Sequence, residues 1–162
     1  MGATTAVKAQ VKLAEIFSPA AIRLSLENRT KLGVIEELVA HLIEIGSLKA
    51  EGKAALVTSI MAREKLGTTA LGNGIAFPHC HSGFAERFVG ALAVDKRGVL
   101  FNAVDGAPVF AVFLLVVPLE EREQQYELLG KITAIGRDKG QRLQLRGCRT
   151  PEAVHDLLRD LD

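Results

Sequence analysis

The chain lacks several features that would tie it to particular classes of protein. Its two cysteines, Cys80 and Cys148, are too few and too irregularly spaced for a disulfide framework, which favours a reduced, cytoplasmic setting. Its 20 basic and 19 acidic residues give a net charge of +1, so electrostatics favours neither nucleic acid nor an anionic membrane as a partner. The longest apolar run, Val109–Val117, is less than half of the ~20 residues that a membrane-spanning helix needs.

Several motifs that would indicate a bound cofactor are also missing. The chain has no Gly-x-x-x-x-Gly-Lys phosphate loop, no Gly-x-Gly-x-x-Gly fingerprint and no Gly-x-Ser-x-Gly elbow. We therefore expect no cofactor and no α/β-hydrolase chemistry. Residues 1–10 lack a secretory signal, and Ala6 stands where myristoylation needs Ser or Thr. These residues are expected to form a loose N-terminal arm of a single domain that spans residues 1–162, a length that suits one core.

Two helices are expected in the first half of the chain. Asn28 or Thr30 is suited to cap the first helix, which should end at Gly46. Its apolar stripe would comprise Leu32, Ile35, Leu38, Val39, Leu42 and Ile45. The second helix should run from about Ala50 to Lys65 and stop at Gly67, because glycine readily adopts the backbone conformation that ends a helix.

The second half of the chain alternates strands with helices. Apolar segments at Ile75–Phe77, Val89–Val94 and Val109–Val117 predict strands, and the last is apolar enough to be buried on both faces. One helix should then turn Leu128, Leu129, Ile132 and Ile135 inward. A final helix should begin at Thr150–Pro151. Helices placed before and after the strands predict an α/β fold, a three-layer α/β/α sandwich with a small mixed β-sheet flanked by helices.

A glycine-rich loop leads into a strand that ends in Pro-His. Gly72 and Gly74 allow a tight turn and a close approach of the backbone, because neither carries a Cβ. Pro78 fixes its φ angle directly before His79. A histidine held at a strand end is well placed to act as a nucleophile, since its neutral imidazole has a free lone pair near pH 7.

These residues carry a family resemblance. The run Arg63-Glu64-Lys65-Leu66-Gly67-Thr68-Thr69, followed by Gly72-Asn73-Gly74-Ile75-Ala76-Phe77-Pro78-His79, resembles the phosphorylation-site signature of bacterial phosphotransferase-system enzyme IIA domains. The class it resembles is the fructose/mannitol (type 2) class, which includes the nitrogen-regulatory IIA proteins. The similarity extends from about Leu13 to Leu161, and its opening part, Leu13–Phe17 through Leu26, has a strand-like layout. The fold that the resemblance implies is the same mixed sheet with helices on both sides.

The resemblance implies a role for individual residues. His79 would carry the phosphoryl group, whereas an isolated histidine after an apolar triplet would more often be structural. Arg63 would lie beside His79 and bind the phosphoryl oxygens through its forked donors. Taken alone, Arg63 would be a solvated cation favoured by the helix dipole. Backbone N–H groups near Gly72–Gly74 would help to hold the oxygens.

One position departs from the family pattern. The family commonly has a second histidine in the helix after the last core strand, and the aligned residue here is Gln125. A glutamine amide can still donate a hydrogen bond to a phosphoryl oxygen, but it cannot be protonated. Gln125 is therefore expected to bind the phosphoryl group, while onward transfer is an open question.

The residues beside His79 admit other interpretations. His81 would face the same side as His79 in an extended segment, and we expect it at the rim of the site. His79-Cys80-His81 also suggests zinc, but a structural zinc site needs four ligands and no second pair is present, so we expect no metal. Flanking histidines could lower the pKa of a Cys80 thiolate, but no family pattern supports a catalytic thiol, so we expect Cys80 to be a small buried or rim side chain. His41 and His155 are expected to face solvent.

The sequence therefore predicts a cytoplasmic phosphotransferase-system component with a phosphohistidine intermediate. The resemblance implies a histidine phosphocarrier protein (HPr-like) as the donor and the IIB domain of a sugar permease as the acceptor. The alternative is a regulatory protein whose phosphorylation state controls binding to a target protein in nitrogen or potassium regulation, which suits a chain with no fused IIB or membrane segment. A third possibility is an interaction module that kept the fold without phosphorylation.

Overall fold

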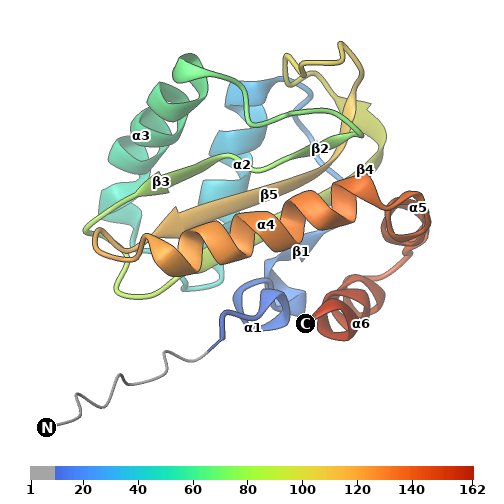
Figure 1. Cartoon of the computed structure of the whole chain (residues 1–162). Helices are drawn as coiled ribbons and strands as arrows, with labels where there is room; N and C mark the ends of the chain where they lie inside the picture. The colour runs from blue at the N-terminus through green and yellow to red at the C-terminus, as the bar shows by residue number, and fades with distance from the viewer. Residues whose placement is uncertain (1–9) are drawn as a thin grey trace, which may run out of the picture.

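The computed structural model describes residues 10–162, so the predicted arm, residues 1–10, lies almost wholly outside the described residues. Figure 1 shows the arrangement of the elements. The helices are α1 (Leu13–Ile16), α2 (Lys31–Glu44), α3 (Lys53–Leu66), α4 (Glu123–Arg137), α5 (Lys139–Gly147) and α6 (Pro151–Leu161). The strands are β1 (Ile22–Arg23), β2 (Ile75–Ala76), β3 (His79–His81), β4 (Val89–Val99) and β5 (Val109–Val117). Two short 3₁₀ turns, η1 (Pro19–Ala21) and η2 (Ala50–Gly52), precede β1 and α3.

The described strands form one mixed sheet in the order β1-β4-β5-β2, with β3 also paired to β5. The two long strands, β4 and β5, are antiparallel, whereas β1 is parallel to β4 and both β2 and β3 are parallel to β5. Strands β2 and β3 therefore form one edge of the sheet, interrupted at Phe77 and Pro78. His79 begins the second half of that edge.

Helices cover both faces of the sheet, as predicted. The side chains of β5 alternate between two apolar clusters, with Val112, Leu114 and Val116 in one and Phe113, Leu115 and Val117 in the other. The first cluster includes the buried faces of α2 and α3, and the second includes those of α4, α5 and α6. Every residue of β5 is buried, which explains its uninterrupted apolar sequence. The predicted three-layer α/β/α sandwich is confirmed (Figure 1).

Helix α2 begins where the sequence predicts. The Thr30 side chain accepts a hydrogen bond from the Gly33 N–H at 3.2 Å, so Thr30 and not Asn28 is the cap. The buried residues of α2 are Val34, Ile35, Leu38, Val39 and Leu42. Leu32 was placed in the stripe wrongly, because it lies in the first turn and its side chain is 45% exposed. Helix α3 begins three residues later than expected, since η2 occupies the predicted start, and it ends at Gly67.

The opening segment and one helix differ from the sequence predictions. Leu13–Ile16 is a short helix and not the strand-like start that the resemblance suggested. The Asp162 carboxylate accepts hydrogen bonds from the N–H groups of Leu13 (2.8 Å) and Ala14 (3.0 Å), which satisfies donors that a helix start leaves unpaired. Helix α5 has no counterpart in the prediction. Among the described helices, none has the length and apolar character needed to cross a membrane.

Candidate functional site

Strand β3 orients His79 toward helix α4. His79 pairs with Leu115 of β5, and Leu115 belongs to the apolar cluster under α4. His79 and His81 lie two residues apart and so project from the same face of the sheet. Cys80 projects from the opposite face and packs in the cluster that contains α3. The extended backbone thus separates the cysteine from the two histidines.

The backbone before His79 determines which of its ring nitrogens is available. Nδ1 of His79 lies 2.9 Å from the carbonyl oxygen of Phe77. A carbonyl can only accept, so Nδ1 carries the proton and Nε2 has the lone pair. His79 is 6% exposed, and burial lowers its pKa, with the nearby positive charge of Arg63 and the neighbouring His81 acting in the same direction. The imidazole is therefore neutral at pH 7, and its Nε2 atom has the free lone pair.

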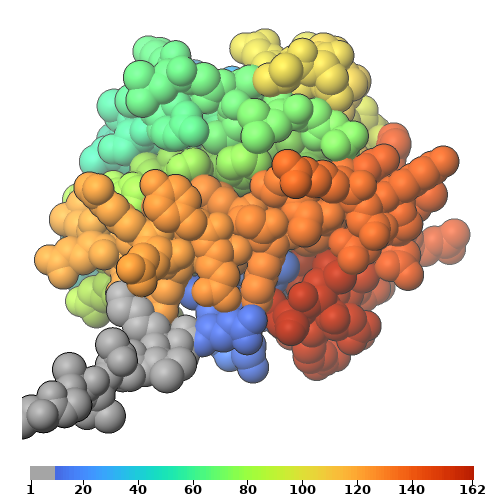
Figure 2. All heavy atoms as spheres, in the orientation of Figure 1, coloured from blue at the N-terminus to red at the C-terminus, as the bar shows by residue number. Residues whose placement is uncertain are grey.

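His79 lies in an open pocket of about 850 Å³ between the end of α3 and the start of α4. The pocket is lined by Ser59, Ala62, Arg63, Leu66, Phe77, His79, Cys80, His81, Leu119, Arg122, Gln125, Tyr126 and Leu129. In Figure 2 the surface of α4 (orange) meets the surface of the segment that carries β2 and β3 (green) along a seam. The structure thus brings together the three predicted site residues, Arg63, His79 and Gln125, from three separate elements.

Arg63 reaches the pocket from the last turn of α3. One of its Nη atoms donates a hydrogen bond to the carbonyl oxygen of Gly67 at 3.0 Å, which leaves its other donors for a ligand. Its positive charge opposes protonation of His79, so the two side chains are close enough to interact electrostatically. Arg63 therefore lies in the His79 pocket with guanidinium donors available, and its phosphoryl-binding role stays a prediction.

The residue after Arg63 fixes the end of α3. Glu64 is 4% exposed, and its carboxylate accepts hydrogen bonds from the backbone N–H of Thr69 (3.2 Å) and from the Thr69 hydroxyl. Lys31 of α2 forms an ion pair with the same carboxylate at 3.0 Å. These contacts tie α3 to α2 and to the loop that follows. They therefore fix the helix turn from which the Arg63 side chain extends.

Gln125 enters the pocket from the first turns of α4. It is 7% exposed, and among residues 10–162 we find no hydrogen bond to its side-chain amide. The same face of α4 also presents Arg122, Tyr126 and Leu129 to the pocket. None of these three was predicted as a site residue, although helical spacing of three and four residues from Gln125 indicates Arg122 and Leu129.

The two residues that follow His79 lie in different environments, since Cys80 is buried and His81 is exposed. His81 is exposed and lines the pocket, at the predicted rim. Burial raises the pKa of the Cys80 thiol to about 11, so the thiol stays protonated at pH 7 and does not suit nucleophilic chemistry. Within residues 10–162, no group of three or more His, Cys, Asp or Glu side chains is placed to hold a metal ion. His41 and His155 are half-buried rather than solvent-facing, because each bonds a backbone carbonyl, that of Ala20 and that of Ala14.

The glycine-rich loop does not reach the His79 pocket. Gly72 and Asn73 line a separate hollow against α4, and the Gly74 carbonyl accepts hydrogen bonds from the N–H groups of Phe110 and Ala111. Gly74 lies five residues before His79 along the extended edge, a separation of about 16 Å. Its φ angle is +75°, and a Cβ there would lie 2.5 Å from the Phe110 ring. The loop glycines thus have a structural role, and the expectation that their N–H groups bind phosphoryl oxygens is not supported.

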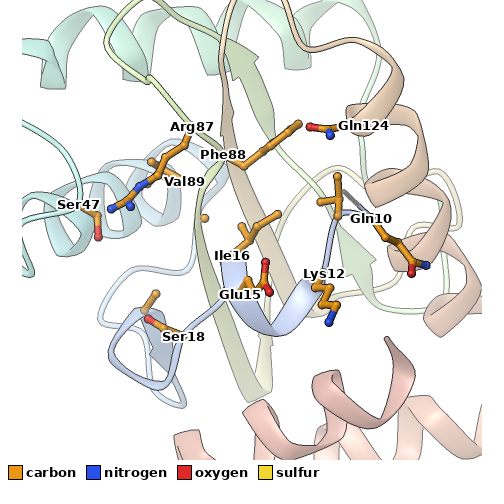
Figure 3. A pocket seen from close by; sticks show the side chains of 13 residues that line it. Gln10, Lys12, Glu15, Ile16, Ser18, Ser47, Arg87, Phe88, Val89 and Gln124 are labelled. Atoms are coloured by element: carbon orange, nitrogen blue, oxygen red, sulfur yellow. The ribbon is translucent and has the colours of Figure 1, made fainter. Parts of the chain in front are cut away.

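A second pocket of about 560 Å³ lies beside α1 and the start of β4. In Figure 3, Arg87 extends toward Ser47 on one side of this pocket, while Glu15 extends from α1 and Lys12 from the residue directly before it. It contains none of the predicted site residues. Its lining combines charges of both signs with apolar side chains such as Phe88, and it has no group with the nucleophilic arrangement of His79.

Comparison with known proteins gives a consistent result. The family model for the phosphoenolpyruvate-dependent sugar phosphotransferase system, EIIA 2, matches residues 15–161. A nitrogen regulatory protein of Pseudomonas aeruginosa is 33% identical over 153 residues, which cover 93% of this chain and 97% of that protein. The crystal structure of nitrogen regulatory protein IIA-Ntr from Neisseria meningitidis is 32% identical, with a TM-score of 0.81 over 90% of this chain and 97% of that one.

A complex of known structure contains a more distant neighbour. In the complex of enzyme IIAMTL and phosphorylated enzyme IIBMTL from Escherichia coli, the matching chain is 21% identical, with a TM-score of 0.71 over 87% of this chain and 94% of that one. At this identity the similarity shows a shared fold.

Proposed function

The chain belongs to the EIIA 2 family of the phosphoenolpyruvate-dependent sugar phosphotransferase system, and on that basis we propose that it is a phosphoryl carrier in which His79 accepts and returns the phosphoryl group. The donor would be a histidine phosphocarrier protein of the HPr type. The acceptor would be a IIB domain, as the composition of the Escherichia coli IIA–IIB complex suggests. The observation that carries the proposal is the hydrogen bond from His79 Nδ1 to the Phe77 carbonyl, since it leaves Nε2 unprotonated in the pocket.

The geometry suggests how the transfer proceeds. The Nε2 lone pair forms a bond to phosphorus while the nitrogen–phosphorus bond of the donor breaks, and the bonding electron pair returns to the donor imidazole. The proton on Nδ1 of His79 stays in place, and the Phe77 carbonyl stabilises the positive charge that the ring acquires. Arg63 and Gln125 would bind the phosphoryl oxygens, so that catalysis consists mainly of alignment and charge stabilisation.

The surface around the pocket supports a protein as the transfer partner. Leu66, Leu119 and Tyr126 line the pocket, yet their side chains are 86%, 61% and 73% exposed. Large apolar groups that are exposed together on one surface are typical of a protein-binding site. A partner that covers them would also exclude water from the phosphoryl group during transfer.

A regulatory role is the second candidate. Two relatives at 32–33% identity, matched over 97% of their own length, are nitrogen regulatory proteins. Phosphorylation of His79 would add about 1.5–2 negative charges in the middle of the exposed apolar surface, enough to change which proteins bind there. Transport and regulation would therefore use the same phosphorylated residue, with a different protein on the docking surface.

A direct test is incubation with phosphoenolpyruvate, enzyme I and the phosphocarrier protein, followed by intact-mass measurement. We expect one acid-labile phosphoryl group on the natural chain, none on His79→Ala, and one on His81→Ala. His81 is the matched control because it lies on the same strand and lines the same pocket. Undiminished label in His79→Ala would overturn the assignment. No label on the natural chain would favour an interaction module that kept the fold.

A further inference from the structure

A second concentration of charge lies at the far end of the sheet from His79. Four cations line a pocket of about 580 Å³ there, Lys96 and Arg97 from β4 and Arg146 and Arg149 from the end of α5 and the link to α6. We call it the basic pocket. From Val89, which lies beside the β3 end of the sheet, Lys96 is seven residues further along β4, or about 23 Å. The phosphoryl chemistry at His79 therefore does not account for the basic pocket.

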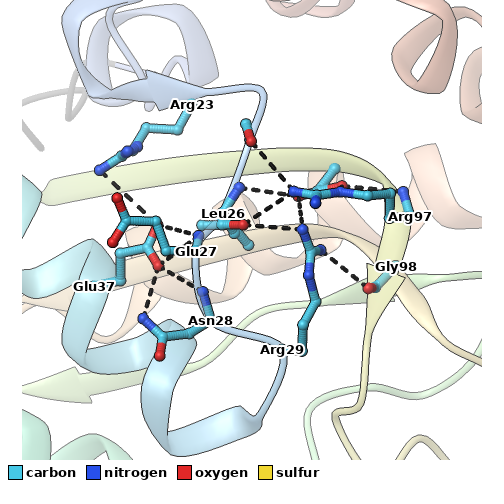
Figure 4. Close-up of polar contacts among 10 residues, drawn as sticks. Arg23, Leu26, Glu27, Asn28, Arg29, Glu37, Arg97 and Gly98 are labelled. Carbon is cyan, nitrogen blue, oxygen red and sulfur yellow. Dashed lines mark hydrogen bonds and ion pairs between the residues drawn. The ribbon is translucent and has the colours of Figure 1, made fainter.

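The one carboxylate in the basic pocket cannot neutralise these cations. Asp95 is 3% exposed, and both of its oxygens are occupied. Arg29 and Arg97 contact Oδ2 at 2.9 and 3.1 Å, and Arg97 also donates to Oδ1 through its backbone N–H and Nε. Figure 4 shows Arg29 and Arg97 converging on this network beside Leu26. The four cations that line the pocket thus share it with one carboxylate, and Arg29 adds a further positive charge to that carboxylate, in a chain whose net charge is only +1.

Two of the guanidinium groups are held in place with donors to spare. Arg97 uses Nε and one Nη atom for Asp95, Ser25 and Leu26, so the other Nη atom is free to bind a ligand. Arg146 donates one bond to the Lys96 carbonyl at 3.0 Å and lies over the Phe110 ring at 5.5 Å. Fixed arginine donors lose little side-chain entropy on binding an anion, and their fork matches phosphate oxygens.

The other two cations of the basic pocket are Lys96 and Arg149, and their charged groups are available to a ligand. Lys96 and Arg149 are exposed, and neither forms an ion pair or side-chain hydrogen bond with another residue in the range 10–162. Leu24, Val94 and Cys148 supply an apolar side to the pocket. We propose that the basic pocket binds a small molecule that carries two or more adjacent phosphate groups, because two fixed guanidinium groups and two exposed cations line one concave surface. Such a ligand would reach the protein independently of the partner docked at His79.

The test is a titration of the full chain with sodium pyrophosphate at constant ionic strength, followed by backbone amide NMR. We expect saturable shifts at Lys96, Arg97, Arg146 and Arg149, and weaker binding of orthophosphate and citrate. Lys96→Gln combined with Arg149→Gln should weaken pyrophosphate binding about tenfold, since charge-assisted contacts are the strong ones. Lys49→Gln with Lys53→Gln removes the same charge from exposed positions elsewhere and should bind as the natural chain does.

Three results would overturn the proposal. The first is that pyrophosphate shifts the amide signals of surface cations throughout the protein. The second is that the two double variants bind pyrophosphate with equal affinity. The third is that an acidic peptide displaces pyrophosphate at equal charge concentration. Phosphorylation of His79 should be unchanged in Lys96→Gln with Arg149→Gln, because neither residue lines the His79 pocket. If the basic pocket does not bind pyrophosphate, the proposed carrier function at His79 is therefore unaffected.

Discussion

The Nδ1 atom of His79 and the carbonyl oxygen of Phe77 are 2.9 Å apart, in residues separated only by Pro78. Proline fixes its own φ angle and restricts the residue before it, so the short segment that supplies the acceptor is itself stiff. The ring tautomer is therefore determined by a local backbone contact. It does not depend on a carboxylate partner, which is the more familiar means of orienting a reactive histidine.

The first prediction concerns pH. Because burial lowers the His79 pKa below 6.5, the neutral form that attacks phosphorus should persist into mildly acidic solution. We expect the rate of phosphoryl acceptance to be flat above about pH 6.5 and to fall below it. Protonation of the buried ring also favours the unfolded chain, so unfolding free energy should decline over the same acidic range. Stopped-flow transfer at several pH values checks this, and an acid limb above pH 6.5 would contradict it.

The second prediction concerns Arg63. Arg63→Ala should slow phosphorylation by at least about tenfold, equivalent to roughly 1.4 kcal/mol of barrier. Arg63→Lys keeps the positive charge but lacks the forked donors of the guanidinium group, so it should recover only part of the phosphorylation rate. Thermal unfolding should change little, because the helix loses only one exposed contact, the bond to Gly67. If the Ala variant transfers at the natural rate, Arg63 is a surface cation after all.

The third prediction concerns Gln125. Gln125→His should introduce a new pH dependence between about pH 6 and 8, because histidine titrates there and an amide does not. His79 should remain the residue that is phosphorylated. If only the histidine variant accepts phosphate, the natural chain has lost transfer activity. Identical rates and pH profiles for the two chains would show that Gln125 takes no part in the chemistry.

The fourth prediction concerns Glu64. Glu64→Gln should destabilise the fold by about 3 kcal/mol, because it leaves Lys31 without its partner and weakens the bonds to Thr69. Equilibrium urea unfolding measures the change. Glu51→Gln, at an exposed position just before α3, is the control and should be neutral. A Glu64 variant as stable as this control would show that the network does not stabilise the end of α3.

The fifth prediction concerns Asp95. Burial opposes ionisation of this carboxyl group, but hydrogen bonds from Arg97 and Arg29 outweigh it and hold its pKa well below the usual range. Asp95 therefore contributes stability above its unfolded pKa of about 4, and this contribution is lost as the pH falls toward the lower folded value. Asp95→Asn should cost about 1–3 kcal/mol at pH 7, since both guanidinium groups are partly exposed. The difference between the two chains should shrink below about pH 4, and a constant difference would contradict this account.

Local signals account for what the sequence predicts well. Strand β5 matches Val109–Val117 because a strand buried on both faces has an uninterrupted apolar sequence. The caps of α2 and α6 match because Thr30 and Thr150 bond N–H groups three residues ahead. His79, Arg63 and Gln125 were assigned through the family resemblance, and the fold places all three in one pocket.

Features that depend on distant contacts were missed. Helix α1 is capped by Asp162, which lies 149 residues beyond Leu13 in the chain. Helix α5 has nine residues and buries only Leu145, so it is too short to show a run of apolar positions at helical spacing. The half-burial of His155 depends on a carbonyl 141 residues away. The glycine-rich loop suggested phosphoryl binding for a different reason. Its glycines resemble those of a phosphate-binding loop, but Gly74 is needed because its backbone packs against the Phe110 ring.

The interruption of the sheet edge at Pro78 also bears on how this edge could pair with another chain. An unpaired strand edge is a template on which another chain can add a strand and begin to aggregate. Here β2 has two residues and β3 has three, and the proline between them has no N–H to offer an incoming strand. The edge that carries His79 is thus a poor template for β-pairing, although the proposed partner would approach it. Replacing Pro78 with valine would lengthen the available ladder, and the first loss would be resistance to aggregation at high concentration.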